Sequence, residues 1–267
     1  MSSRTSARGS SGLAETAKTI VYAIVIALVI RTFFYEPFSI PSGSMIPTLL
    51  VGDYLFVSKF SYGYSRYSLP LGLPLFSGRM FFSPPHRGDV VVFKLPKNPS
   101  IDFIKRVIGL PGDRIQMKEG VLYINDKPVK RERVGVYQDP ASGATYTEYM
   151  ETLPNGITHP ILMLPREYTT PPKVCDDPSK AFDPATFDPD NTCPYIVPAG
   201  HYFMMGDNRD NSSDSRDPSS GVGYVPAENL VGHAVFLFFS TNGYAHWWEF
   251  WDWPFTVRYV RLFTSIH

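Results

Sequence analysis

The chain has 267 residues, of which 43% are apolar, and its 25 Lys and Arg balance 25 Asp and Glu. This composition supports one large core or two modest ones and excludes a disordered protein. Zero net charge, with no basic stripe and no stacking motif, argues against a nucleic-acid partner. The only cysteines, Cys175 and Cys193, form neither a CxxC nor a Cys/His zinc spacing, so we expect no metal and no other cofactor.

An apolar segment near the amino terminus is the first predicted element. Residues 1–12 are small, polar and basic, and we expect them to form a disordered cytoplasmic tail. We assign residues 13–35 to a transmembrane anchor, because the 21 residues from Ala14 to Phe34 would span about 31 Å as a helix. That length matches a hydrocarbon core of roughly 30 Å.

A cleavable signal peptide is the alternative for this segment, because its most apolar part, Thr19 to Ile30, has only 12 residues. Arg31 and three bulky aromatic residues follow, where small residues would mark a cleavage site, and this favours a retained anchor. Basic residues outnumber acidic ones before the span. The positive-inside rule therefore predicts a cytoplasmic amino terminus, with the rest of the chain on the far side.

The part after the anchor has the pattern of an all-β protein with mainly antiparallel sheets. Short β-branched and aromatic runs alternate with turn residues, and no convincing amphipathic helix occurs between residues 36 and 240. Asn125 and Asp126 suit the turn of a hairpin over residues 120–134. The other expected strands lie within residues 53–60, 88–96, 102–110, 201–211 and 231–239.

The chain after residue 113 is expected to leave the first domain and return to it. Between residues 131 and 198 the composition shifts to Pro, Asp and Thr, and the periodicity fades, which indicates part of a second, looser domain. The predicted organisation is a catalytic core of residues 36–113 and 199–267, interrupted by an inserted second β domain of residues 114–198. The aspartates of the insert lack the spacing of a calcium loop, so solvated turns are expected there.

Two features of the later chain stay open at this point. Cys175 and Cys193, with 17 residues between them, could close a loop worth about 3 kcal/mol in an oxidising compartment, and two free buried thiols are the alternative. All four tryptophans fall within residues 246–253. That segment is either a late part of the core or a membrane-proximal belt at the lipid interface.

Ser44 is a candidate nucleophile in the stretch SIPSGSMIPTLLVGD, residues 39–53. Gly43 permits a close backbone approach and unusual dihedrals, and Pro41 and Pro47 restrict the chain on either side, so Ser44 is expected on a rigid exposed turn. A serine nucleophile also needs a base and donors for the developing oxyanion. Without them this serine would be an ordinary turn residue.

Lys105 is the candidate base, because none of the six histidines lies in a stretch that resembles a known triad motif. A lysine acts as a base near neutral pH only when an apolar setting keeps it desolvated. Phe103, Ile104, Val107 and Ile108 flank Lys105 on a probable strand, DFIKRVIGLPGD. Lys105 would be a suitable base if it faced inward, and an ordinary surface lysine if it faced water.

Four motifs together resemble the signature boxes of bacterial type I signal peptidases, a family with a Ser/Lys dyad. They are PSGSMIPTL at 41–49, RGDVVVFK at 87–94, IKRVIGLPGD at 104–113 and MGDNRDNSSDSR at 205–216. They occur in the family's order and after an anchor like the family's. The resemblance covers roughly residues 20–113 and 195–240.

The resemblance implies a role for each matching site residue. Ser44 matches the nucleophile and Lys105 the general base, and the Ser44 N–H with Ser42 matches the oxyanion hole. Ser212 matches a serine that orients the lysine, and Asp214 and Arg216 match a supporting charged pair. The positions that match the shallow substrate-binding pockets, and that would otherwise be read simply as core, are Phe38, Ile40, Met45, Leu49, Leu55, Val92 and Ile104.

The implied function is that of a membrane-bound serine endopeptidase, which removes signal peptides from exported preproteins after small residues, at sites of the Ala-X-Ala type. The resemblance further implies a monomer that contacts membrane lipid, held in the inner (plasma) membrane with a periplasmic catalytic domain. A conjugation-type peptidase that matures pilin-like substrates is one alternative, and an inactive membrane-tethered binding module is another. Two departures from the family are the single span and Phe103, where tyrosine is frequent.

Overall fold

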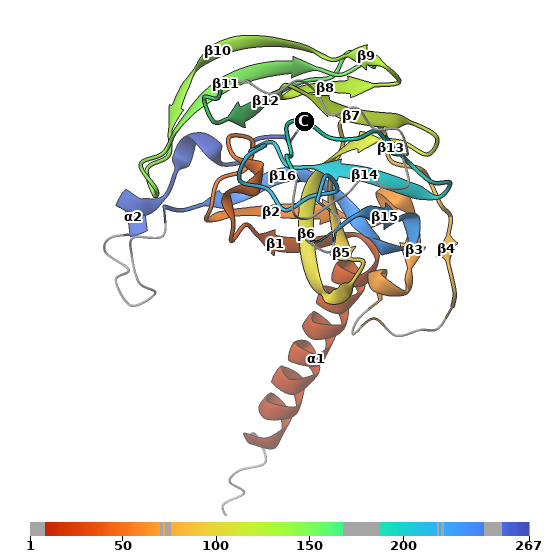
Figure 1. Cartoon of the computed structure of the whole chain (residues 1–267). Helices are drawn as coiled ribbons and strands as arrows, with labels where there is room; N and C mark the ends of the chain where they lie inside the picture. The colour runs from red at the N-terminus through yellow and green to blue at the C-terminus, as the bar shows by residue number, and fades with distance from the viewer. Residues whose placement is uncertain are drawn as a thin grey trace, which may run out of the picture.

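The computed structural model describes residues 9–69, 72, 76–167, 187–217, 219, 222–242 and 253–266. One long helix, α1 (Gly9–Phe33), projects from a body built of β-sheets (Figure 1). Within α1, Ala14–Phe33 has a mean hydropathy of 1.7, and only 6% of its most apolar stretch is buried against the rest of the protein. In the described part of the chain this is the one helix long and apolar enough to cross a membrane, and it agrees with the predicted anchor.

A seven-stranded sheet forms the centre of the body, in the order β1-β2-β16-β5-β6-β14-β15, and every neighbouring pair in it is antiparallel. It unites strands from both ends of the chain, because β16 inserts between β2 and β5. The strands are β1 (Tyr35–Ser39), β2 (Asp53–Ser58), β5 (Val90–Leu95), β6 (Asn98–Gly109), β14 (His201–Met205), β15 (Tyr224–Pro226) and β16 (Leu230–Ser240).

Three smaller sheets complete the β structure. A four-stranded sheet has the order β13-β7-β8-β9, a three-stranded sheet the order β10-β11-β12, and β3 pairs with β4. Their strands are β3 (Tyr64–Ser65), β4 (Arg79–Met80), β7 (Arg114–Lys118), β8 (Val121–Ile124), β9 (Lys127–Pro128), β10 (Lys130–Gln138), β11 (Thr145–Thr152), β12 (Thr158–Met163) and β13 (Tyr195–Ile196). The all-β prediction with one amino-terminal helix is therefore confirmed.

The described helices other than α1 are all short. They are α2 (Trp253–Thr256) and the 3₁₀ segments Gly43–Met45, Phe60–Tyr62, Arg66–Ser68, Ala227–Asn229 and Tyr259–Arg261. The predicted hairpin turn is present between β8 and β9, where Asn125 and Asp126 have φ of 53° and 64°. Positive φ at two successive residues is the conformation that Asn and Asp tolerate best, which is why the sequence predicted this turn.

The part of the insert that follows the hairpin is more regular than the fading periodicity predicts. Residues 130–163 form the three-stranded sheet β10-β11-β12, which lies on the side of the body away from α1 (Figure 1). The pattern is weak because β10 buries none of its nine residues fully. Its partly buried positions are Arg131, Gly135 and Tyr137, so the strand lacks the apolar alternation that a sequence pattern detects.

The predictions for the amino-terminal tail, the cysteines and the tryptophans fall partly on residues outside the described part of the chain. Residues 9–12, expected in the disordered tail, belong to α1 instead, and residues 1–8 lie outside the described part. Cys193 is disulfide-bonded, and Cys175, the chain's only other cysteine, lies outside the described residues. Three of the four tryptophans do too, while Trp253 begins α2.

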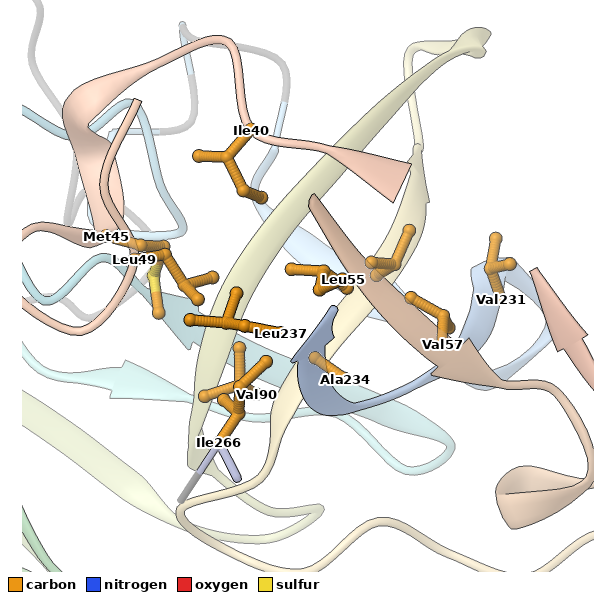
Figure 2. Packing of buried hydrophobic residues seen from close by; sticks show 11 residues of the cluster. Ile40, Met45, Leu49, Leu55, Val57, Val90, Val231, Ala234, Leu237 and Ile266 are labelled. Atoms are coloured by element: carbon orange, nitrogen blue, oxygen red, sulfur yellow. The ribbon is translucent and has the colours of Figure 1, made fainter. Parts of the chain in front are cut away.

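An apolar cluster of eleven buried residues packs against β1, β2, β5 and β16 (Figure 2). Leu55, Val57, Val90 and Leu237 are at most 1% exposed within it. The segment after β1 adds Met45 and Leu49, both fully buried, to the same cluster. Burial of these two side chains fixes the Ser44 turn against the sheet.

Candidate active site

Ser44 lies in the 3₁₀ segment Gly43–Met45, directly after β1. It is 7% exposed, so the expected exposed turn is instead a buried one. The reason is contact from across the molecule, since the Asn208 N–H donates to the Ser44 carbonyl at 3.1 Å. Gly43 does not use the unusual dihedrals open to glycine, but it lies in a tight place, because a Cβ there would be 3.0 Å from Ile46 Cδ1.

Lys105 faces inward from β6 and meets Ser44. Its Nζ lies 2.6 Å from Ser44 Oγ and donates to the Ile104 carbonyl at 3.1 Å. The Phe103 ring centroid lies 5.2 Å from the same Nζ. Burial lowers the pKa of Lys105 to about 8, an effect that nearby Asp214 and Asp207 oppose and Arg216 reinforces. The amine therefore loses its proton at a pH well below that of an ordinary lysine, and the neutral amine can accept the hydroxyl proton of Ser44.

The Ser212 side chain is buried beside the same turn. A Cβ at Gly206 would lie 2.3 Å from Ser212 Oγ and 2.5 Å from the Ser44 carbonyl oxygen, so only glycine fits between them. Ser212 Oγ is not bonded to Lys105 in the described structure, and its hydroxyl instead lies close enough to Asp214 to help lower the pKa of that carboxyl. Its expected role toward the lysine therefore stays a prediction.

Asp214 and Arg216 form a buried ion pair. The Arg216 guanidinium donates through Nε and Nη2 to the two Asp214 oxygens at 2.9 Å each. Burial alone would raise the pKa of Asp214, but the Arg216 charge and the Gly206 N–H, 3.1 Å away, hold it below its ordinary value. Asp214 thus stays ionised near Lys105, with Arg216 as its counter-charge.

A second group of buried charges was missed by the sequence reasoning. Arg106 donates to both oxygens of Asp207, at 2.9 and 2.7 Å, and Thr48 donates to Asp207 at 2.5 Å. Arg209 donates to both oxygens of Glu151, at 3.0 and 2.5 Å. Arg106, Asp207 and Arg209 lie inside the quoted motifs, but nothing in the sequence indicates their partners.

Glu151 and His159 connect the three-stranded sheet to this group. They face each other across β11 and β12, and His159 Nε2 lies 3.5 Å from the Glu151 carboxylate and 3.9 Å from that of Asp207. His159 is fully buried, and neither of its ring nitrogens has a hydrogen-bond partner in the described structure. No sequence signal singled out either residue for this position.

The segment 207–209 joins the three-stranded sheet to the Ser44 turn. On one side, Asn208 donates from its backbone to Ser44 and from its side chain to the Gly43 carbonyl, at 3.1 and 3.3 Å. On the other side, Leu162 of β12 donates to Asp207 and accepts from Arg209, each at 2.9 Å. The turn that carries Ser44 is therefore held through this segment by the three-stranded sheet.

The seven residues matched to substrate pockets lie together in the structure. Five of them, Ile40, Met45, Leu49, Leu55 and Val92, are at most 3% exposed members of the cluster in Figure 2. Phe38 and Ile104 are partly buried and pack against that cluster. These two are the ones with surface left to contact a ligand. Ser42 precedes the turn with an extended backbone and an exposed side chain.

The fold and the site together define a membrane-anchored β protein with a buried serine–lysine pair. A profile of the family "Signal peptidase, peptidase S26" matches residues 13–239. The chain therefore belongs to the signal peptidase family S26 and is a membrane-associated serine peptidase that cleaves signal peptides.

Similar proteins are found over almost the whole chain. The chain is 42% identical to a "Signal peptidase I" of Rickettsia typhi over 93% of its length and 92% of the relative's. A "Signal peptidase I" of Rickettsia canadensis is 40% identical, with 95% and 94% covered. A crystal structure of a signal peptidase I from Enterococcus faecalis has 23% identity and a TM-score of 0.31, and the match covers 57% of this chain and 97% of that one.

Proposed function

We propose that Ser44 is the nucleophile and Lys105 the general base of this peptidase. The observation that carries this assignment is the 2.6 Å contact between Ser44 Oγ and a lysine amine whose pKa burial lowers to about 8. Lys105 takes the hydroxyl proton as Ser44 Oγ attacks the scissile carbonyl, and it then returns the proton to the leaving amine.

The Ser44 N–H and the Ser42 hydroxyl are the donors we assign to the developing oxyanion. The Ser44 N–H lies in the first turn of a 3₁₀ segment, where N–H groups have no partner within the segment. The Ser42 side chain does not cap that segment, so its hydroxyl is free to donate to substrate. Ser212, Asp214 and Arg216 support the dyad in this scheme, with Ser212 oriented toward the lysine and the ion pair fixing the 206–216 loop.

The substrates are signal-peptide-bearing preproteins cut after small residues. The support comes from Phe38 and Ile104, which lie partly buried on an otherwise packed cluster, and we therefore assign to them shallow apolar pockets. The other five matched residues, Ile40, Met45, Leu49, Leu55 and Val92, would form the floor of these pockets. The peptide lies extended beside the strands that carry Ile40 and Ile104, so its main chain finds hydrogen-bond partners.

The test compares two synthetic precursors that differ at position −1, the residue before the scissile bond. Purified full-length protein in detergent should cut the peptide with Ala at −1 and reject the one with Phe. The Ser44→Ala variant serves as the blank. Equal cleavage of the two peptides would contradict shallow pockets, and cleavage by the blank would contradict Ser44 as nucleophile.

We further propose the placement of the chain at the membrane. The charge asymmetry of the amino terminus supports a cytoplasmic amino terminus in the inner (plasma) membrane, with a periplasmic catalytic domain. The enzyme acts as a monomer in contact with lipid. The domain division of 36–113, 114–198 and 199–267 is supported by a chain that leaves the seven-stranded sheet after β6 and returns at β14.

A further inference from the structure

A cavity of about 730 Å³ lies where α1 meets the seven-stranded sheet. Its lining comes from the end of α1, from the central sheet and from residues 67, 69 and 72 after β3, and it includes Arg31, Glu36, Phe38, Lys59, Lys94 and Asp102. Neither member of the proposed dyad lines it. Phe38 is shared with the proposed substrate pockets, so the cavity borders the path of the substrate on the membrane side.

Strands β1 and β6 give this path a direction. They are separated by three strands with antiparallel neighbours throughout, so β1 and β6 run the same way. Both begin at the membrane end, because β1 follows α1 and the first half of β6 lines the cavity with Arg31. A substrate that emerges from the membrane between them runs outward along both strands, from the cavity to the dyad.

Side-chain alternation then relates substrate positions to residues of the enzyme. Residues two apart on a strand share a face, so Glu36 lies on the face of Phe38, and Asp102 on that of Ile104. In the β5–β6 ladder Val92 is opposite Ile104 and Lys94 is opposite Asp102, which puts these side chains on the same face. If position −3 of the substrate contacts Phe38 and Ile104, position −5 lies between Glu36 and Asp102.

Two ion-paired groups line the part of the cavity where position −5 would lie. Lys94 Nζ lies 2.9 Å from both Asp102 oxygens, and Glu36 is bound by Lys59 at 2.8 Å and by Arg31 at 2.7 Å. Lys59 is 4% exposed, so its pair with Glu36 is a built part of the site. Burial would raise the pKa of Glu36, but the two cations hold it below its ordinary value, and the carboxylate stays charged.

An apolar side chain placed between these ion pairs would remove their water without replacing its hydrogen bonds. An amide or hydroxyl side chain would supply hydrogen bonds in place of those of the water. The cations also suit the end of a substrate helix, whose last carbonyls lack partners and carry partial negative charge.

We propose that this cavity is a further specificity subsite, which takes a polar, hydrogen-bonding side chain at position −5 between the Lys94–Asp102 pair and Glu36. The inference rests on the proposed function, because position −5 is counted from the bond that Ser44 attacks.

The test uses two precursor peptides that differ only by Gln or Leu at position −5, side chains of similar size. Full-length protein in detergent should cut the Gln peptide with a kcat/KM about tenfold higher. Lys94→Leu/Asp102→Leu removes both charges together, so neither is left unpaired. This variant should abolish or invert the ratio of kcat/KM for the Gln peptide to kcat/KM for the Leu peptide. Lys130→Leu/Glu132→Leu removes an exposed pair on β10, outside the cavity, and should keep the wild-type ratio.

Each outcome has a distinct meaning. A ratio near one for the wild type, or a ratio that the cavity variant leaves unchanged, overturns the subsite while the rejection of Phe at position −1 persists. Failure of the wild type to cut either peptide overturns the proposed function and the subsite with it. If the double variant does not fold by circular dichroism, Lys94→Met, which fills similar space without charge, should lower the ratio at least threefold, and no decrease overturns the subsite.

Discussion

Ser44 Oγ and Lys105 Nζ lie 2.6 Å apart although 61 positions separate the two residues in the sequence. The contact is buried, with Ser44 7% and Lys105 3% exposed. A lysine in such a setting loses the hydration that favours its charged form, and a serine so close to it has an acceptor for its proton. The proposed dyad is thus the product of burial as much as of proximity.

Ser44→Ala, Lys105→Ala and Lys105→Arg should each abolish cleavage of the precursor with Ala at position −1. The first two remove one member of a unit whose losses do not add. The third keeps a cation but cannot supply a base, because guanidinium does not lose its proton in proteins. Turnover is measured by separation of the peptide products, and circular dichroism shows that each variant is folded. Substantial turnover by any folded variant would contradict the dyad.

The pH dependence should follow the titration of Lys105. Its pKa of about 8 means that the amine is charged and inactive below this value, so kcat/KM should rise about tenfold per pH unit up to pH 8 and then level off. A histidine base would place this rise near pH 6.5. The measurement is a kcat/KM profile from pH 5 to 10.

The controls for this profile are the six histidines, replaced one at a time, and Ser212→Ala. The histidine variants should keep the position of the rise. Ser212→Ala should slow the reaction, because the proposed orientation of the lysine is lost. Disappearance of the rise in one histidine variant, with Lys105 intact, would assign the base to that histidine.

Ser42→Ala should lower kcat by roughly 10²-fold without abolishing activity. One oxyanion donor typically contributes about this much, and the Ser44 N–H would remain as the second donor. Ser42→Thr, which keeps a hydroxyl, is the matched control and should lose far less. A wild-type kcat for the alanine variant would show that Ser42 is only a turn residue.

The sequence predicted the parts of this protein that depend on local pattern. The anchor followed from the length of one apolar run, and the Asn125–Asp126 turn from residues that tolerate positive φ. The dyad could be named only through its motifs. Local pattern cannot show that Lys105 faces Ser44, because the folded sheet determines which way the side chain points. Glu151 and His159 carried no signal, since their charged partners Arg209 and Asp207 come from a segment far along the chain that only folding brings to β11 and β12.

Glu151→Gln should destabilise the protein and slow catalysis together. It leaves the Arg209 guanidinium buried without its carboxylate, a loss of about 3–5 kcal/mol in the free energy of unfolding. It also loosens the 207–209 segment that binds the Ser44 backbone. Urea unfolding and kcat are measured, and Glu151→Gln/Arg209→Met should recover much of the stability, because no unpaired charge remains. Equal stability of Glu151→Gln and wild type would show that the pair contributes nothing.

His159 should make the folded protein sensitive to mild acid. Burial and the nearby Arg106 lower its pKa to about 4, and the facing carboxylates of Asp207 and Glu151 only partly oppose this, while Arg209 reinforces it. In the unfolded chain the pKa is about 6.5. Between these values the unfolded chain binds a proton that the folded chain does not, so the free energy of unfolding falls as the pH drops from 6.5 to 4.

His159→Phe should remove this sensitivity, which amounts to about 3 kcal/mol over the window from pH 6.5 to 4. The apolar ring has nearly the same shape, and no hydrogen bond is lost, because neither ring nitrogen of His159 has a partner in the described structure. Urea unfolding in detergent, followed by tryptophan fluorescence at half-unit pH steps, gives the difference between variant and wild type. That difference should grow in favour of the variant as the pH falls. His86→Phe is the control, since the His86 side chain is 84% exposed and should leave the curve unchanged. Parallel curves for His159→Phe and wild type would mean that His159 titrates alike in the folded and unfolded chains.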